Sequence, residues 1–199
     1  MTVFFSASQL AKQSCSKIMF DQMHGYKTVI TDRMKEGEKW QQSQTTSPFY
    51  EMAGSRVLSG VGFNFAVDEI RRTARTFWLI EHKMVSETSE EWFFHNSIIQ
   101  TAFYGALVRA GDGHLSTAKF LNDPEPKELF VPWQKARSRL NFGGDMYNVT
   151  CNDVAVLKFF VTKARCIGDW NKAKQFDATY KKQEWIKYFK YDVTFTRVR

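Results

Sequence analysis

The sequence predicts an α/β protein with a central mixed β-sheet flanked by helices. Three observations predict this class. Residues 62–70 and 76–84 alternate apolar and polar side chains with the period of a strand. Residues 98–107 place apolar side chains three and four positions apart, as on one face of a helix. Neither repeats nor Pro-, Ser- or Gly-rich linkers divide the 199 residues, so we expect a single domain.

Two helices are expected ahead of the strands. The first begins at Ser6, which forms a capping-box pattern with Gln9, and runs to about Lys17. The second begins after Thr31 or Asp32 and ends in the polar run QQSQTTSP.

A β-hairpin is expected next. The runs GFNFAVDEI (62–70) and TFWLIEHKM (76–84) are joined by the short polar segment RRTAR (71–75). In the first run, alternation places Phe63, Phe65 and Val67 on one face and Asn64, Ala66 and Asp68 on the other. The run SRVLSG (55–60) predicts another strand before the hairpin.

Helical periodicity returns after the hairpin. Ser86 or Ser89 can cap a helix that ends near Gly111. Residues 128–133 then predict a strand whose Pro132 favours an edge or a strand end. A helix capped by Asn152 and a final strand at 192–198 complete the expected elements.

The positive charge is concentrated near the end of the chain. The formal net charge is +7, and from Lys158 onward 11 Lys and Arg residues face four acids. Aromatic residues alternate with these lysines in EWIKYFKY (184–191), a pattern typical of surfaces that bind phosphates and stack on bases. The alternative is a solvated exterior over an aromatic core stripe. The candidate DNA contacts are Lys181, Lys182, Lys187 and Lys190 here, and Arg71, Arg72 and Arg75 in the hairpin connection.

Several functional classes lack support in the sequence. No apolar stretch approaches the ~18 residues of a membrane span, and the N-terminus has no basic leader followed by an apolar run. We therefore expect a cytoplasmic protein without a membrane partner. No phosphate loop, nucleophile elbow or dinucleotide-binding motif is present in the sequence.

Asp68, Glu81 and Lys83 form the clearest chemical constellation. Glu81 and Lys83 project from the same face of one predicted strand, and Asp68 lies within reach on its hairpin partner. Two neighbouring carboxylates suit Mg²⁺ or Mn²⁺, and a lysine beside such an ion fits phosphodiester hydrolysis. The alternative is a surface ion pair of little energetic consequence. The apolar residues around all three favour a buried site, where unpaired charge is costly.

Five sequence blocks, taken in order, resemble the PD-(D/E)XK nuclease superfamily and specifically its RecB-like branch. That branch includes the RecB nuclease domain, CRISPR-adaptation exonucleases and phage recombination exonucleases. The similarity covers roughly residues 4–110. The blocks are FFSASQLAKQSC (4–15), MKEGEKWQQ (34–42), VGFNFAVDEI (61–70), FWLIEHKMV (77–85) and the pair Gln100 and Tyr104 of a Q-x-x-x-Y signature.

The resemblance implies a restriction-endonuclease-like core of αβββαβ order. The whole of residues 1–199 would form one nuclease domain, with the core at about 4–150 and a basic part at about 151–199. It implies a metal-dependent DNA nuclease, more specifically an exonuclease in replication, recombination or repair of a phage or mobile element, acting in the host cytoplasm. Its metal ligands would be Asp68 and Glu81 with Gln41, and its other catalytic residues Lys83, Gln100 and Tyr104.

Two departures from the family pattern keep alternatives open. Gln41 stands where the family has a histidine, and an amide is a poorer ligand for Mn²⁺ than an imidazole. Only Cys15, Cys151 and Cys166 are present, so we expect no iron–sulfur cluster, which needs four thiolates. The alternatives are a catalytically silent nucleic-acid-binding protein on a nuclease fold and an endonuclease. An oligomer is possible, but no sequence feature indicates an interface.

Overall fold

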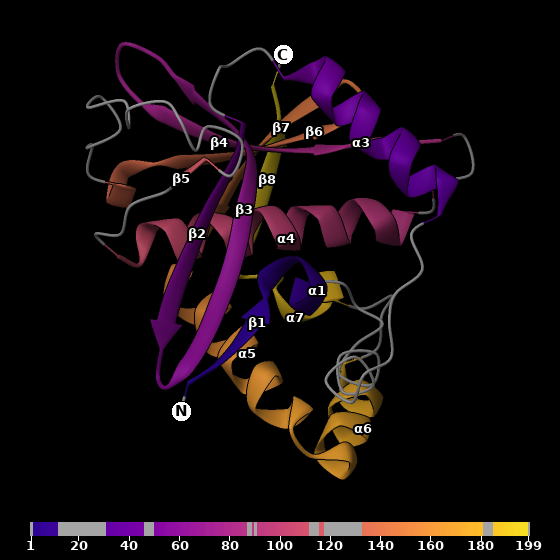
Figure 1. The fold of residues 1–199 in the computed structure, drawn as a ribbon, viewed down its shortest axis with the longest axis vertical. Helices are drawn as coiled ribbons and strands as arrows, with labels where there is room; N and C mark the ends of the chain where they lie inside the picture. Colours follow the sequence, from indigo (N-terminus) through magenta and orange to yellow (C-terminus); the bar gives the residue numbers. More distant parts are fainter. Residues whose placement is uncertain are drawn as a thin grey trace.

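The structure, a computed structural model, describes residues 2–11, 31–45, 50–86, 89, 91–111, 116–117, 133–180 and 185–198. In these ranges the chain forms a mixed, open β-sheet flanked by helices (Figure 1). This confirms the predicted α/β class.

The sheet has eight strands in the described part of the chain, in the order β5-β2-β3-β4-β6-β7-β8, with β1 beside β3. The pairs β1/β3 and β4/β6 are parallel, and the other pairs are antiparallel. The strands are β1 (Val3–Ser6), β2 (Tyr50–Leu58), β3 (Val61–Arg72), β4 (Phe77–Lys83), β5 (Ser116–Thr117), β6 (Arg137–Phe142), β7 (Asp145–Cys151) and β8 (Val193–Arg197).

One long helix, α4, crosses one face of the sheet, and α1, α5, α6 and α7 lie on the same side (Figure 1). Helix α3 lies against β4. No helix among the described residues is both long and apolar enough to cross a bilayer. The helices are α1 (Ala7–Ala11), α3 (Asp32–Gln44), α4 (Glu91–Arg109), α5 (Asp153–Ile167), α6 (Trp170–Thr179) and α7 (Trp185–Tyr188), with a 3-10 turn at Trp133–Lys135.

The core joins the hairpin to the C-terminal helices. Phe103 of α4 meets Phe63 of β3 edge-on, with ring centroids 5.7 Å apart, and stacks on Phe160 of α5 at 3.8 Å. All three side chains are fully buried, and aromatic contacts of this kind add to the free energy of burial. The basic C-terminal part therefore contributes helix α5 to the same core as the strands.

Strand β3 changes its neighbour halfway along its length. Its first residues, Val61–Asn64, pair with β1, and its last residues, Glu69–Arg72, pair with β4. Residues 65–68 lie between these two segments and are registered with neither β1 nor β4. The candidate site lies beside them.

Most of the predicted elements are confirmed. The hairpin forms, and helices α3 and α5 carry the expected caps: Thr31 accepts from the amide of Met34, and Asn152 accepts from that of Ala155. The final strand and helix α4 are also present. The first helix beyond Ala11 and the strand expected at 128–132 lie outside the described residues, and Trp133 belongs to a 3-10 turn.

The β6/β7 hairpin was not predicted. Its turn contains Gly143 and Gly144 with φ angles of 62° and 101°, a left-handed conformation that glycine adopts without steric cost. Two adjacent glycines between alternating runs are a hairpin signal, so the sequence did contain the information.

Candidate functional site

Asp68 and Glu81 lie where β3 and β4 separate. The last registered pair of this ladder is Glu69 with Ile80. Glu69 is the residue after Asp68 on β3, and Ile80 is the residue before Glu81 on β4. In place of a further backbone pair, the amide of His82 donates to Oδ2 of Asp68 at 2.8 Å. The Asp68 side chain therefore substitutes for the next ladder bond and is fixed beside Glu81.

Strict alternation along β3 does not extend to Asp68. Asn64 and Ala66 are exposed, as expected for that face, but Asp68, Glu69 and Ile70 are all at least half-buried. Across the sheet on β2, Glu51 adopts a positive φ of 50°, and the registered pairs omit both Glu51 and Asp68. The prediction that Asp68 shares a face with Asn64 and Ala66 was therefore wrong, because the ladder is irregular at this residue.

Glu81 is the centre of the site. Its Oε1 accepts hydrogen bonds from Nζ of Lys83 at 2.5 Å and from Nε2 of Gln100 at 2.7 Å. The residue is only 3% exposed. Its second oxygen, Oε2, is buried and has no hydrogen-bond partner among the described residues. A buried, unpartnered carboxylate oxygen is costly, so this atom is a candidate ligand for a cation.

The two carboxylates and the lysine strongly influence one another. Burial, followed by the negative charge of Glu81, raises the pKa of Asp68 to about 7. Burial by itself would lower the pKa of Lys83, but the charges of Glu81 and Asp68 raise it. Lys83 is therefore a protonated donor at neutral pH rather than a base.

Tyr104 and Gln100 extend from α4 toward this centre, four residues apart on one helix face. Tyr104 is 5% exposed, and burial together with the charges of Glu81 and Asp68 raises the pKa of its phenol. Hydrogen bonds with Ser8 of α1 and with Gln100 act in the opposite direction. The phenol thus stays protonated and joins α1 to the group that holds Glu81.

The other face of β4 carries a buried polar network around His82. Nε2 of His82 lies 2.9 Å from Oε2 of Glu69, and Nδ1 lies 3.0 Å from the amide nitrogen of Asn141. Because Oδ1 of Asn141 accepts from the amide of Gly144, its nitrogen is the donor to Nδ1. His82 then carries its proton on Nε2 and donates to Glu69. His82 is thus a packed histidine on the face of β4 opposite Glu81 and Lys83.

Gln41 does not contact the carboxylates in any recorded interaction. It lines a cavity of about 580 Å³ between α3, the end of β4 and the start of α4. Lys83 also lines this cavity, together with Arg33 and the aromatic residues Trp92 and Phe93. The predicted residue therefore lines the same cavity as Lys83.

The predicted basic contacts are dispersed. Arg71 forms a hydrogen-bonded ion pair with Glu69, and Arg72 lies over the ring of Phe77. Arg75 is exposed in the hairpin turn. Lys187 and Lys190 are exposed in and after α7, while Lys181 and Lys182 lie outside the described residues. None of the described five has a recorded contact with Asp68, Glu81 or Lys83.

Some residues of the site were not singled out from the sequence. Ser8 belongs to the first block of the family resemblance, so a signal for it existed. Glu69 lies in the third block (61–70), so the same signal existed for it. Asn141 lies outside the blocks, and its role depends on the pairing of β4 with β6.

Comparison of the chain with protein-family models, with curated proteins and with solved structures found no match.

Proposed function

We propose that this protein is a metal-dependent nuclease that hydrolyses phosphodiester bonds in DNA. One observation carries the proposal: two carboxylates from neighbouring strands, the half-buried Asp68 and the buried Glu81, converge beside the ammonium group of Lys83. Burying two such carboxylates together is unfavourable unless a cation or a function compensates.

The side chains fit a divalent cation. Oε2 of Glu81 has no partner, and the carboxylate of Asp68 is poised to share a cation with it. The described residues contain no group of three His, Cys, Asp or Glu side chains arranged for a metal. Two carboxylates would therefore hold Mg²⁺ or Mn²⁺ with water completing the shell, as Mg²⁺ prefers. Such an ion would supply Lewis-acid stabilisation of the charge that develops on the phosphate.

The protein side chains supply positioning and charge. The protonated Lys83 can donate to the attacking water or to a phosphate oxygen, which stabilises negative charge in the transition state. Gln100 holds Glu81 through Oε1. Tyr104 touches Gln100 and Ser8 and so acts as a positioning residue.

The topology also supports the nuclease resemblance. Helix α3, strands β2, β3 and β4, helix α4 and strand β6 occur in the αβββαβ order, with the two-residue strand β5 and the 3-10 turn between α4 and β6. Strand β3 is antiparallel to β2 and β4, whereas β6 runs parallel to β4. We infer from this order a restriction-endonuclease-like core, with the Asp68 strand and the Glu81 strand adjacent at its centre.

We infer that the substrate approaches through the 580 Å³ cavity beside Lys83. Arg33 at its edge, held by Ser86, can meet a phosphate, and Trp92 can contact a base. The resemblance to RecB-like and phage enzymes favours an exonuclease over an endonuclease.

A second function is favoured by the interaction of Lys83 with Glu81. At 2.5 Å the ammonium group of Lys83 already neutralises one oxygen of Glu81, which is one of two carboxylates that the described residues place in the centre, and Gln41 offers no imidazole. The alternative is therefore a nucleic-acid-binding protein that uses the nuclease fold without catalysis.

Digestion of end-labelled linear DNA and of closed circular DNA distinguishes these functions. We expect Mg²⁺- or Mn²⁺-dependent shortening of the linear DNA, no cutting of the circle and no reaction in EDTA. Asp68→Asn and Lys83→Gln should abolish the reaction, while Asp32→Asn and Lys35→Gln, an exposed pair on α3, should retain it. Cutting of the circle would identify an endonuclease. Binding without hydrolysis under every metal condition would favour the silent protein.

A further inference from the structure

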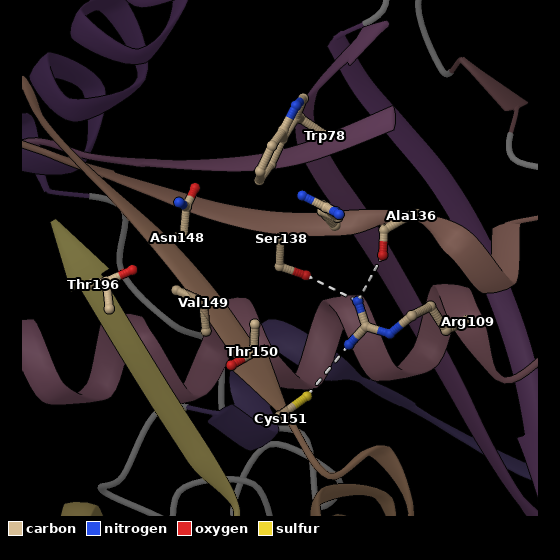
Figure 2. A pocket seen from close by; sticks show the side chains of 10 residues that line it. Trp78, Arg109, Ala136, Ser138, Asn148, Val149, Thr150, Cys151 and Thr196 are labelled. Carbon is tan, nitrogen blue, oxygen red and sulfur yellow. Dashed lines mark hydrogen bonds between the residues drawn. The ribbon is translucent and has the colours of Figure 1, made fainter. Parts of the chain in front are cut away.

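A second polar cavity, separate from the carboxylates, opens where β6 and β7 part. Ser138 and Val149 form the terminal registered pair of these strands, and the cavity beyond them has a volume of about 460 Å³. Figure 2 shows Trp78 on one side of the strands and Arg109 with Cys151 on the other, beside α4. The cavity therefore reaches both faces of the sheet at this point.

Arg109 closes one end of the cavity and is fully engaged. It donates to both oxygens of Asp153, at 2.7 and 2.8 Å, and to the carbonyl of Ala136, the hydroxyl of Ser138 and Sγ of Cys151. A bidentate ion pair with three further bonds is a structural role. A ligand must therefore be recognised by the residues on the Trp78 side.

That side carries three arginines, Arg71, Arg137 and Arg139, which we call the arginine cluster. The guanidinium of Arg139 lies 3.5 Å from the ring centroid of Trp78, and that of Arg137 lies 5.8 Å from it. Burial, and after it the charges of Arg71 and Arg137, lower the pKa of Arg139. The three cations are thus close enough to repel one another.

The cluster is only partly balanced by acids. Glu69 pairs with Arg71. Arg139 donates to the neutral amide oxygen of Asn148 at 2.9 Å. Within the described ranges, no carboxylate forms an ion pair with Arg137 or Arg139. An anion bound at the cluster would therefore relieve repulsion that the fold leaves in place.

We propose that the arginine cluster binds the phosphate backbone of DNA at the mouth of this cavity, as a surface separate from the cleavage centre. Guanidinium forks match phosphate oxygens bidentately, and Thr150 and Thr196 add hydroxyl donors at the cavity wall. Trp78 is only 8% exposed and serves to hold Arg139 in place. The cluster thus lacks the exposed aromatic anchor that protein–protein interfaces favour.

The cluster lies on the face of β4 opposite the cleavage centre. Trp78 precedes Lys83 by five residues, about 17 Å at the rise of a strand, and shares the face of His82 rather than that of Glu81 and Lys83. DNA that contacts both places would have to pass around the sheet, without a contact from this cluster to the scissile phosphate. The choice of DNA as partner rests on the function proposed above.

The test measures binding without hydrolysis. A fluorescein-labelled single-stranded oligonucleotide is titrated in EDTA at several salt concentrations, with fluorescence anisotropy as the readout. Arg137→Gln/Arg139→Gln should raise the dissociation constant at least about tenfold and reduce the salt slope by about 1 to 2. The control Lys158→Gln/Lys172→Gln, exposed residues on α5 and α6, removes the same charge and should change binding less than about twofold.

Folding and partner identity are checked separately. Arg137 is exposed, so Arg137→Gln alone should fold normally and still weaken binding severalfold. Unchanged affinity for DNA in the double arginine variant would overturn the proposal, and so would an equal loss of affinity in the control variant. Poly-glutamate that competes as effectively as unlabelled DNA would also overturn it. Loss of binding in the arginine variants of a protein that never cleaves DNA would support this surface and reject only the nuclease activity.

Discussion

The backbone amide of His82 donates to the carboxylate of Asp68 at 2.8 Å, while the side chain of His82 is bonded to Glu69 and Asn141 on the other face of the sheet. One residue thus fixes the end of β4 from both faces. Its two chain neighbours, Glu81 and Lys83, project into the candidate site. The geometry of the three charged groups therefore depends on a residue that does not itself enter the site.

Replacing His82 by alanine should destabilise the fold. The change leaves Glu69 and the amide of Asn141 buried without the ring between them, and an unsatisfied buried polar group costs about 1–3 kcal/mol. Urea denaturation should show that the free energy of unfolding falls by about 3 kcal/mol or more. The control His95→Ala removes a ring 3.8 Å from the exposed Glu91 and should change the free energy of unfolding by less than about 0.5 kcal/mol. Equal effects of the two variants would show that the network does not fix β4.

Asp68→Asn should abolish the effect of Mg²⁺ on stability. The raised pKa of Asp68 means that the folded state favours the protonated acid, so its ionisation destabilises the metal-free protein as pH rises from the ordinary value of 3.8 through about 7. In EDTA at pH 8 the variant should therefore melt at a higher temperature than the wild type. Added Mg²⁺ should raise the melting temperature of the wild type and of Asp32→Asn, but not of Asp68→Asn. A wild type that does not respond to Mg²⁺ or Mn²⁺ would contradict the metal site.

Substitutions of Lys83 and of Tyr104 should lower the kcat of cleavage to different extents. Lys83→Gln removes the donor closest to Glu81 and should lower kcat by about 100-fold or more. Tyr104→Phe removes only the hydroxyl that bonds to Ser8 and Gln100, so kcat should fall less than about tenfold and its pH profile should keep its shape. A Tyr104→Phe variant as impaired as Lys83→Gln would make Tyr104 a catalytic residue.

The ion pair between Arg109 and Asp153 should make the free energy of unfolding depend on pH under acidic conditions. Burial would raise the pKa of Asp153, but the hydrogen bonds and charge of Arg109 lower it overall. A lowered pKa gives stabilisation that is complete above the unfolded value, about 3.9, and is lost as pH falls through the folded value. The stability advantage of the wild type over Asp153→Asn should be constant above about pH 5 and should shrink below about pH 4. An advantage independent of pH would exclude the ion pair as its cause.

The sequence was sufficient where local pattern decided the outcome. The alternation of residues 76–84 identified the face shared by Glu81 and Lys83, and the spacing of Gln100 and Tyr104 identified one face of α4. Alternation failed at Asp68 because β3 exchanges β1 for β4 beside it, and no local pattern encodes a change of neighbour. The polar network of His82 and the arginine cluster depend on β6, whose hairpin was not predicted.

Gly105 of α4 should not tolerate alanine, although alanine normally stabilises a helix interior by about 1 kcal/mol relative to glycine. A Cβ at Gly105 would lie 2.1 Å from Oγ of Ser138 and 2.8 Å from a guanidinium nitrogen of Arg109. The helix would have to move away from β6, or Arg109 would have to leave its bonds to Ser138 and Asp153, at a cost of about 1–3 kcal/mol. Gly37 of α3 is the matched control, because nothing lies within 4 Å of the Cβ position there, so Gly37→Ala should stabilise the protein. Chemical denaturation of both variants measures the difference, and a stabilised Gly105→Ala protein would show that α4 does not approach β6 this closely.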